Sequence, residues 1–388
     1  MDNIKRIYVD NAATTPVAPQ VIEAMSSCFN DTWGNPSSLH YEGQKAKEIL
    51  DAARNKISGL LDCKAEELYF TSCGTEADNW AIKGAAHAAK KGRNKIITTK
   101  IEHPAVLNTC KALEKEGFLV KYISVDENGV VNMEELASEI DETTIIVAVM
   151  YANNEIGTIQ PIRKITKLAH DKGALMFTDA VQAVGSVPIN IRELDVDMLS
   201  FSGHKLNAPK GIGGLFIKKG VRIPNLIEGG GQEQGKRGGT ENVPYIVGLA
   251  KALELAVGRL DDMKRVALMR DRIIDALSKV PSSRLNGDRY LRLPGNINMS
   301  FEFVEGESLI LWLNEMGIAA STGSACSSKS LNPSHVLLAI GLPIEMAHGS
   351  LRISLAHLNT DDEADYIIKT VPQIVDKLRA MSPIYPGK

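Results

Sequence analysis

Short, almost wholly apolar runs alternate with helix-forming segments between residues 60 and 220, and this alternation constrains the fold more than any other feature. Five runs predict strands: ELYFTS at 67–72, NKIITT at 94–99, TTIIVAVMYA at 143–152, ALMFTD at 174–179 and DMLSFS at 197–202. Strands without polar alternation are typical of a mostly parallel sheet with helices on both faces. Two such helices are predicted by TEADNWAIKGAAHAAKKG at 75–92 and PIRKITKLAHDKG at 161–173. We therefore expect an α/β domain.

The pattern changes near residue 255. A long amphipathic helix is predicted at 260–280, followed by the strand-like NINMSFEF, the helix-like GESLILWLNEMG and the strand-like SLRISLA. A last helix begins with Thr360 and Glu363 in the spacing of a capping box. These elements indicate a second, smaller α+β domain.

Composition excludes several classes of protein. The 388 residues are 44% hydrophobic and carry a formal net charge of -3, without the run of Lys or Arg that nucleic-acid binding would need. Neither a signal peptide nor a membrane-spanning stretch is recognisable, so we expect a cytoplasmic protein without a membrane partner. The five cysteines form no C-x-x-C pair, and neither a disulfide framework nor a zinc site is predicted.

Polar residues directly follow several predicted strands. In sheets of this kind ligands bind beyond the carboxyl ends of the strands. Lys205 stands just past one strand, after Ser202, Gly203 and His204. It is either an ordinary loop lysine or an amine held at a ligand for Schiff-base chemistry. Asp179 and Gln182 follow another strand. Asp179 is either a turn residue or a carboxylate that keeps a pyridinium nitrogen protonated.

Three further strand ends carry compatible groups. Gly74 and Thr75 open a helix, where free N–H groups suit a phosphate, although Thr75 could equally be a simple N-cap. His103 precedes another helix, and Asn154 lies in YANNEIG. The glycine-rich stretch EGGGQEQGKRGGTEN at 228–242 lacks the Walker pattern and is interpreted as an ordered loop near a ligand or a subunit contact.

Cys326 lies in GIAASTGSACSS and is followed by SSKSLNPSH, whose composition favours a loop. A thiol in such a loop could swing between an active site and an acceptor. For Cys28, Cys63 and Cys110 the interpretation as small buried hydrophobic residues is favoured, and Cys73 is expected to pack beside the turn of Gly74.

Nine motifs, in order, identify a family resemblance: DNAATTP, GNPSSLH, TSCGTEAD, EHPAV, NNEIGT, TDAVQAVG, SGHKLNAPKG, RGGTEN and TGSACSS. The chain resembles the NifS/IscS-type cysteine desulfurases, which depend on pyridoxal 5'-phosphate. The resemblance implies the fold type I of pyridoxal-phosphate-dependent transferases, the aspartate-aminotransferase type, in a homodimer. It implies a large domain at 15–255 and a small domain formed by 1–14 and 256–388.

The resemblance also assigns roles. Lys205 is expected to bind the cofactor covalently, Asp179 to pair with the pyridine nitrogen, Gln182 with the phenolic oxygen, and His103 to lie over the ring. The phosphate is expected to contact Gly74, Thr75, Ser202 and His204, together with Thr240 of the neighbouring subunit. Gly203 and Asn154 are also expected to belong to the cofactor-binding residues. Asn154 and Arg352 are expected to hold the carboxylate of L-cysteine, Arg352 through a two-pronged contact. Without the family, Arg352 would be read as a surface or interdomain ion pair.

The implied reaction produces L-alanine and a persulfide on Cys326. Lys205 and His103 would move protons, and Cys326 would attack the substrate sulfur as a thiolate. The sulfur would pass to an iron–sulfur scaffold protein of the NifU/IscU kind, where the persulfide transiently meets iron.

Three other functions compete with this one. A selenocysteine lyase of the same fold would not require Cys326 for its selenium substrate. An aminotransferase has no use for a cysteine on a polar loop. A non-catalytic pyridoxal-phosphate-binding partner protein would not need Lys205, Asp179 and Cys326 together.

Overall fold

The computed structural model describes residues 6–322, 333–383 and 385–386. Its largest sheet has seven strands in the order β2-β8-β7-β6-β5-β3-β4. The strands are β2 (Leu68–Thr71), β3 (Lys95–Thr99), β4 (Leu119–Ile123), β5 (Thr144–Ala148), β6 (Leu175–Asp179), β7 (Met198–Ser202) and β8 (Gly213–Ile217). All neighbouring pairs are parallel except those of β8, which runs antiparallel to both β2 and β7. The five strands predicted from apolar runs are therefore confirmed, and they belong to one mostly parallel sheet.

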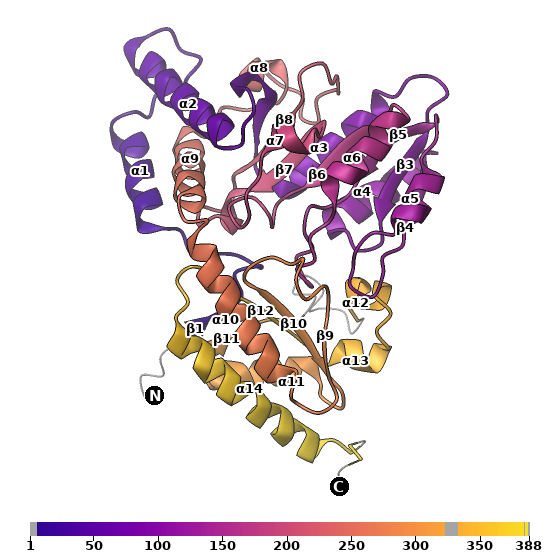
Figure 1. Ribbon diagram of the computed structural model, residues 1–388. Helices are drawn as coiled ribbons and strands as arrows, with labels where there is room; N and C mark the ends of the chain where they lie inside the picture. Colours follow the sequence, from indigo (N-terminus) through magenta and orange to yellow (C-terminus); the bar gives the residue numbers. More distant parts are fainter. Residues whose placement is uncertain (1–5, 323–332, 384, 387–388) are drawn as a thin grey trace.

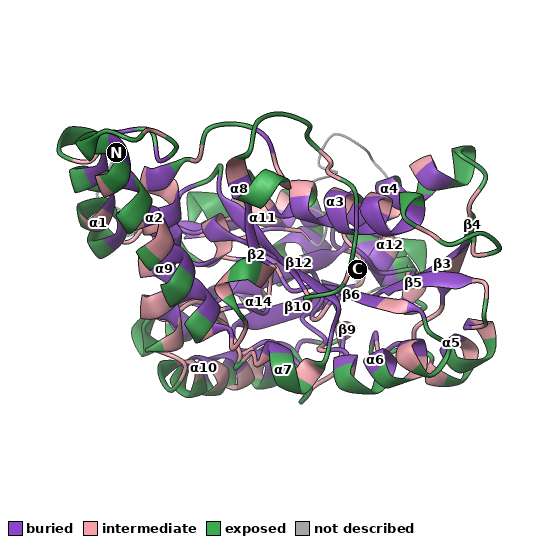
Figure 2. Ribbon diagram, turned by 90° about the horizontal axis from the view of Figure 1, so that it is seen from above, coloured by how far each residue is buried: buried purple, intermediate pink, exposed green. Residues whose placement is uncertain are grey.

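Helices cover both faces of this sheet (Figure 1). Ile96, Ile146 and Phe177 pack toward α3 (Gly74–His87) and α4 (Pro104–Lys115) in one core. The alternate residues of the same strands enter another core, on the opposite face. That core includes residues of α1 (Pro19–Asn30), α2 (Tyr41–Leu60), α5 (Met133–Glu139), α6 (Ile162–Asp171), α7 (Ile191–Leu194) and α9 (Val243–Val257). The apolar composition of the strands follows from this double burial, which Figure 2 shows as a buried layer between helices with exposed outer faces.

A second region is built from the chain after α9 together with the first described residues, which include β1. An antiparallel sheet has the order β12-β10-β9, and β1 pairs with β11 in a parallel two-stranded sheet. The strands are β1 (Ile7–Tyr8), β9 (Ser283–Leu285), β10 (Asn296–Phe301), β11 (Ile318–Ala319) and β12 (Ser350–Ser354). The helices are α10 (Asp262–Leu277), α11 (Gly306–Glu315), α12 (His335–Ala339), α13 (Ile344–His348) and α14 (Asp361–Met381). Ile7 and Val9 share one core with side chains from Val266 to Leu378, so residues from both ends of the chain pack together.

Short elements complete the fold. They are the turns η1 (Ala65–Glu67) and η2 (Gly203–Lys205) and the helix α8 (Gln232–Gly235). Across the residues that the structure describes, no helix is both long and apolar enough to cross a membrane. The predicted capping box is confirmed, because Thr360 accepts from the Glu363 N–H and Glu363 accepts from the Thr360 N–H, each at 3.3 Å.

Candidate active site

The ends of five strands, β2, β3, β5, β6 and β7, lead into one cavity of about 510 Å³. Because these strands run in the same direction, their carboxyl ends meet at one edge of the sheet. Ten residues predicted from the sequence line this cavity: Gly74, Thr75, His103, Asn154, Asp179, Gln182, Ser202, His204, Lys205 and Arg352. The fold therefore brings together side chains that lie far apart in the sequence.

Lys205 is placed at the cavity by the one-turn helix η2, directly after β7. Its Nζ donates to the carbonyl oxygen of Ala12 at 2.5 Å and to that of Ala13 at 2.7 Å. Gln182 donates from Nε2 to the same Ala12 oxygen at 3.0 Å. The DNAATTP motif thus supplies backbone acceptors that hold the amine against the cavity wall.

Asp179 is the last residue of β6 and is 5% exposed. Burial raises the pKa of its carboxyl, while the nearby His103, the N–H of Val181 and Lys205 act in the opposite direction. Val181 donates its N–H to Oδ1 at 2.9 Å. A buried carboxylate of this kind is matched chemically by a cation that enters the cavity, such as a protonated pyridine nitrogen.

The turn between β2 and α3 forms another wall. Cys73, rather than Thr75, is the N-cap of α3, and its Sγ accepts from the Glu76 N–H at 3.5 Å. Gly74 has no room for a side chain, because a Cβ there would lie 2.7 Å from Val181 Cγ2. The Ser202 Oγ is buried and has no hydrogen-bond partner among the described residues. A helix N-terminus beside an unpartnered hydroxyl suits a phosphate.

His103 is the N-cap of α4, and its Nδ1 accepts from the Ala105 N–H at 3.1 Å. The neutral ring therefore carries its proton on Nε2. Burial lowers the pKa of His103, and Lys205 and His335 lower it further, whereas Asp179 opposes this effect. Neutral imidazole is thereby favoured.

Arg352 comes from β12, which belongs to the second region of the molecule. Its side chain is 3% exposed, donates to Asp10 Oδ1 at 2.8 Å and to the Asn154 carbonyl at 3.2 Å. Its Nε has no partner among the described residues. The guanidinium therefore makes an ion pair and also lines the cavity beside Asn154.

Three predicted residues stand apart from this cavity lining. Gly203 is buried in η2, and a Cβ there would lie 2.8 Å from Ile212 Cγ2. Thr240 is exposed and lines a different cavity of about 190 Å³. Cys326 lies outside the described residues.

Buried carboxyl groups near the cavity were not anticipated from the sequence. Burial raises the pKa of Glu102 to about 8 and that of Glu155 to about 7. Glu155 accepts from the Ser334 hydroxyl at 2.5 Å, and the Glu102 carbonyl lies 3.0 Å from His335 Nε2. Asp78, on α3, accepts from Ser200 at 2.6 Å, and burial also raises its pKa. All three lie inside motifs of the family resemblance, Asp78 in TSCGTEAD, Glu102 in EHPAV and Glu155 in NNEIGT, but nothing in the sequence indicated their burial.

The remaining predictions for cysteine concern burial. Cys28 and Cys110 are buried, whereas Cys63 is half-buried against the core. Burial raises the pKa of both Cys63 and Cys110 to about 12. These thiols are therefore protonated at neutral pH. Cys73 borders the cavity as expected.

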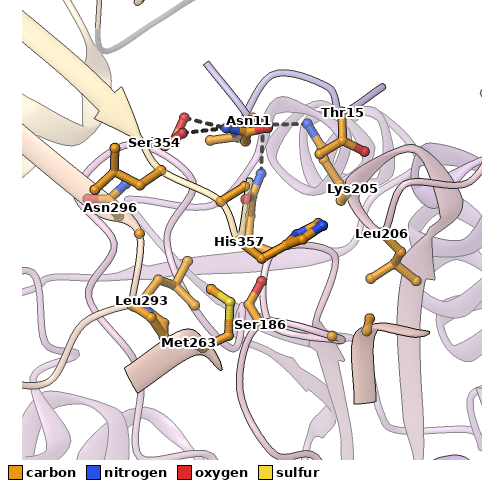
Figure 3. A pocket seen from close by; sticks show the side chains of 18 of the residues that line it. Asn11, Thr15, Ser186, Lys205, Leu206, Met263, Leu293, Asn296, Ser354 and His357 are labelled. Atoms are coloured by element: carbon orange, nitrogen blue, oxygen red, sulfur yellow. Dashed lines mark hydrogen bonds between the residues drawn. The ribbon is translucent and has the colours of Figure 1, made fainter. Parts of the chain in front are cut away.

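Lys205 also lines a second cavity, of about 90 Å³ (Figure 3). Lys205, Gln182 and Ala12 line both cavities. Asn11 holds one wall together by donating from N and Nδ2 to the Ser354 carbonyl. Lys205 therefore borders both cavities.

The residues present fit pyridoxal 5'-phosphate. An amine, a buried carboxylate and an unpartnered hydroxyl beside a helix N-terminus match its aldehyde, its pyridine nitrogen and its phosphate. Within the described residues, no group of three or more His, Cys, Asp or Glu side chains could hold a metal ion.

The fold and this site define a class of enzyme. The chain belongs to the class-V aminotransferase family, whose model matches residues 7–367. Members of this family use pyridoxal phosphate on the fold type I architecture seen here. More narrowly, the chain is a pyridoxal-phosphate-dependent cysteine desulfurase of the NifS/IscS type.

Three similar proteins carry that conclusion. The cysteine desulfurase IscS of Methanosarcina thermophila is 51% identical over 383 residues, which cover 98% of this chain and 95% of that protein. A solved NifS-like protein is 41% identical with a TM-score of 0.91, covering 96% of this chain and 100% of its own. A structure of SspA in complex with cysteine is 36% identical with a TM-score of 0.80, covering 91% and 99%.

Proposed function

We propose that the cavity at Lys205 binds L-cysteine beside the cofactor, and that its sulfur passes to Cys326 and then to an acceptor for iron–sulfur cluster assembly. The observation that carries this proposal is the meeting of Lys205, Asp179, His103 and Arg352 in one cavity. In such a cavity an amino acid can be held by its carboxylate while its Cα lies near both a base and the cofactor.

The cofactor would be held at four points. Lys205 would bind its aldehyde carbon, Asp179 its pyridine nitrogen, and Gln182 its phenolic oxygen. Gly74, Thr75, Ser202 and His204 would surround its phosphate, and Gly203 and Asn154 complete the set of residues proposed for cofactor binding. When bound, pyridoxal phosphate supplies an electron sink for the negative charge that develops at Cα. Asp179 would keep that sink effective by holding the pyridine nitrogen protonated.

Proton movements would belong to Lys205 and His103. The freed Lys205 amine would take the Cα proton of the substrate, because it is released next to that carbon when the substrate amine replaces it. His103 presents Nε2–H as a hydrogen-bond donor, and burial lowers its pKa and so favours the neutral ring. His103 would accept a proton only at Nδ1, in place of its hydrogen bond from the Ala105 N–H, so Lys205 would be the main base and His103 its acid–base helper.

Arg352 and Asn154 would orient the substrate. Arg352 would turn from its present partners toward the substrate carboxylate, for which its unpartnered Nε offers a donor. The structure of SspA with cysteine supports this choice of substrate for a protein of similar fold.

The first sulfur transfer would place the substrate sulfur on Cys326. Its thiolate attacks the sulfur of L-cysteine, the S–S bond forms as the Cβ–S bond breaks, and protons return to carbon. The balance is L-cysteine plus a thiol giving L-alanine plus a persulfide. Transient contact of this persulfide with iron would occur only on the acceptor.

The partners belong to the same proposal. We propose a homodimer in which Thr240 reaches the phosphate site of the other subunit, since it lines a cavity apart from Lys205 in its own chain. We also propose a NifU/IscU-like scaffold as acceptor and a cytoplasmic location, since Cys28, Cys63, Cys73 and Cys110 are all free thiols. The proposed domains are 15–255 for the large one and 1–14 with 256–388 for the small one.

Two variants test the function. Given L-cysteine and a reductant, the native protein should form alanine and sulfide in equal amounts. Lys205→Ala should lower alanine formation by about 100-fold or more, the scale of a lost acid–base group. Cys326→Ala should stop sulfide release, whereas Cys63→Ala, which removes a protonated half-buried thiol, should match the native rate. Sulfide release by Cys326→Ala at the native rate would refute the role of Cys326.

A further inference from the structure

Two ion pairs hold the glycine-rich loop at 228–242 close to the turn at 72–75, where the phosphate is proposed to bind. We call this turn the phosphate turn. The first anchor is Glu233, which is buried and has a positive φ of 47°, as its neighbour Gln234 has at 59°. Left-handed backbone is unfavourable for such residues unless their surroundings fix it. Arg54 fixes it here by donating to both carboxylate oxygens of Glu233, at 2.9 and 2.6 Å.

This first anchor also reaches the sheet. Glu233 Oε2 accepts from the Phe70 N–H on β2 at 2.9 Å, and the Arg54 guanidinium lies 4.5 Å from the centre of the Phe70 ring. Strand β2 leads directly into the turn at 72–75. The loop is therefore fixed to the strand that ends at the phosphate turn.

The second anchor is Arg237, which reaches the turn itself. Its Nε donates to Glu76 Oε1 at 2.9 Å and its Nη2 to Oε2 at 3.2 Å. Glu76 is 9% exposed and Arg237 22% by side chain. From the first turn of α3, Glu76 also accepts from Ser72, at 2.8 Å from the N–H and 2.5 Å from the hydroxyl.

Glu76 poses an electrostatic problem for a phosphate at Gly74 and Thr75. It is an acidic residue in the first turn of the helix that would receive the phosphate, and like charges at one helix N-terminus repel each other. Burial alone would raise the pKa of Glu76, but the hydrogen bonds from Arg237 and Ser72 outweigh it and lower the pKa. The carboxylate stays ionised and is balanced by Arg237.

We propose that Glu76 and Arg237 are positioning residues for cofactor binding: Arg237 neutralises Glu76 so that the turn at 72–75 accepts a phosphate, and links that turn to the loop carrying Thr240. This rests on the proposed function only in placing the phosphate at Gly74 and Thr75. Loss of Arg237 leaves an unbalanced anion beside the phosphate. Loss of both charges removes the repulsion, and the substitution Glu76→Gln keeps a side-chain oxygen that can accept from the Ser72 N–H.

The test compares two ligands on the cofactor-free full chain. Dissociation constants of pyridoxal phosphate and of pyridoxal, which lacks the phosphate, are measured by absorbance titration. Arg237→Gln should weaken pyridoxal phosphate binding by about tenfold, the scale of one unscreened charge at this range, with little change for pyridoxal. The double variant Glu76→Gln with Arg237→Gln should recover to within about threefold of the native value.

The controls separate this from a folding defect. Lys56→Gln breaks the exposed ion pair with Glu254 and should leave both constants unchanged. Arg237→Lys keeps the charge and should retain most of the affinity. An Arg237→Gln variant with native preference for the phosphate ligand would overturn the inference, as would a double variant weaker than the single one. If the native chain bound both ligands equally, the phosphate placement in the proposed function would fail instead.

Discussion

His204 and Lys205 are adjacent, yet their surroundings push them to different chemistry. The Lys205 amine meets two carbonyl oxygens, whereas the His204 Nδ1 lies 3.2 Å from the Thr14 hydroxyl. Burial lowers the pKa of His204 to about 4, and the charges of Lys205 and Lys210 contribute. The ring is therefore neutral at physiological pH and can donate one hydrogen bond to a phosphate without a protonation change.

This pKa predicts a pH dependence of stability. The unfolded chain binds a proton at His204 near pH 6.5, and the folded chain only near pH 4, so stability falls as the pH drops through that window. The free energy of unfolding, measured with urea on the cofactor-free protein, should fall between pH 7.5 and 5. This fall should be about 1 kcal/mol smaller for His204→Asn than for the native chain, a value reduced for the partial exposure of the ring. His348→Asn, which replaces an exposed histidine, should keep the native slope. Equal slopes for the native chain and His204→Asn would contradict the prediction.

Elements differ in how much of their structure is local. Some elements could be predicted because a cap or an apolar run involves only residues close together in the sequence. These include the capping box at Thr360 and the strands β3, β5, β6 and β7. Strand β8 could not be predicted, because Gly213 and Gly214 weaken its pattern. The need for glycine comes from the neighbouring strand, because a Cβ on Gly214 would lie 2.4 Å from the Phe201 ring.

The Thr360 cap gives a prediction for α14. Thr360→Ala should lower the free energy of unfolding by about 1 kcal/mol, because the Glu363 N–H loses its acceptor. Urea denaturation monitored by circular dichroism measures this loss. Thr360→Ser keeps the hydroxyl and should stay close to the native value; an equal loss in both variants would show that the methyl group, not the cap, matters.

At the scale of the whole molecule, the site depends on contacts between its two regions. Asn296 and Asn298 of β10 both donate to the Glu155 carbonyl, at 3.0 and 3.1 Å. Asn298 stands opposite Arg352 in the antiparallel pair of β10 and β12. Sequence patterns place Lys205 and Asp179 at strand ends, but Arg352 joins them only through this tertiary contact, so the resemblance alone could suggest its role.

The contact between β10 and the Glu155 carbonyl predicts that a variant of Asn298 changes the KM for L-cysteine without changing the affinity for pyridoxal phosphate. Asn298→Ala should raise the KM for L-cysteine by about tenfold, since the side chain opposite Arg352 is lost together with one of the two donors to the Glu155 carbonyl. Affinity for pyridoxal phosphate should not change. Asn296→Ala removes a donor to the same carbonyl but stands opposite Ser354, and should leave KM near the native value. Steady-state kinetics would contradict the prediction if both variants raised KM equally.

The position of β8 has a consequence for the order in which the chain folds. Leu68 of β2 pairs with Phe216 of β8, and Ile7 of β1 with Ile318 of β11. Closing such long loops is slow, because their entropy is lost before the contacts form. A nascent chain that ends before β8 lacks the strand with which β2 pairs, and β2 leads into the turn that starts at Ser72. We therefore expect the cofactor site to form only after β8 has been synthesised, and to be completed later still, when Arg352 of β12 joins it.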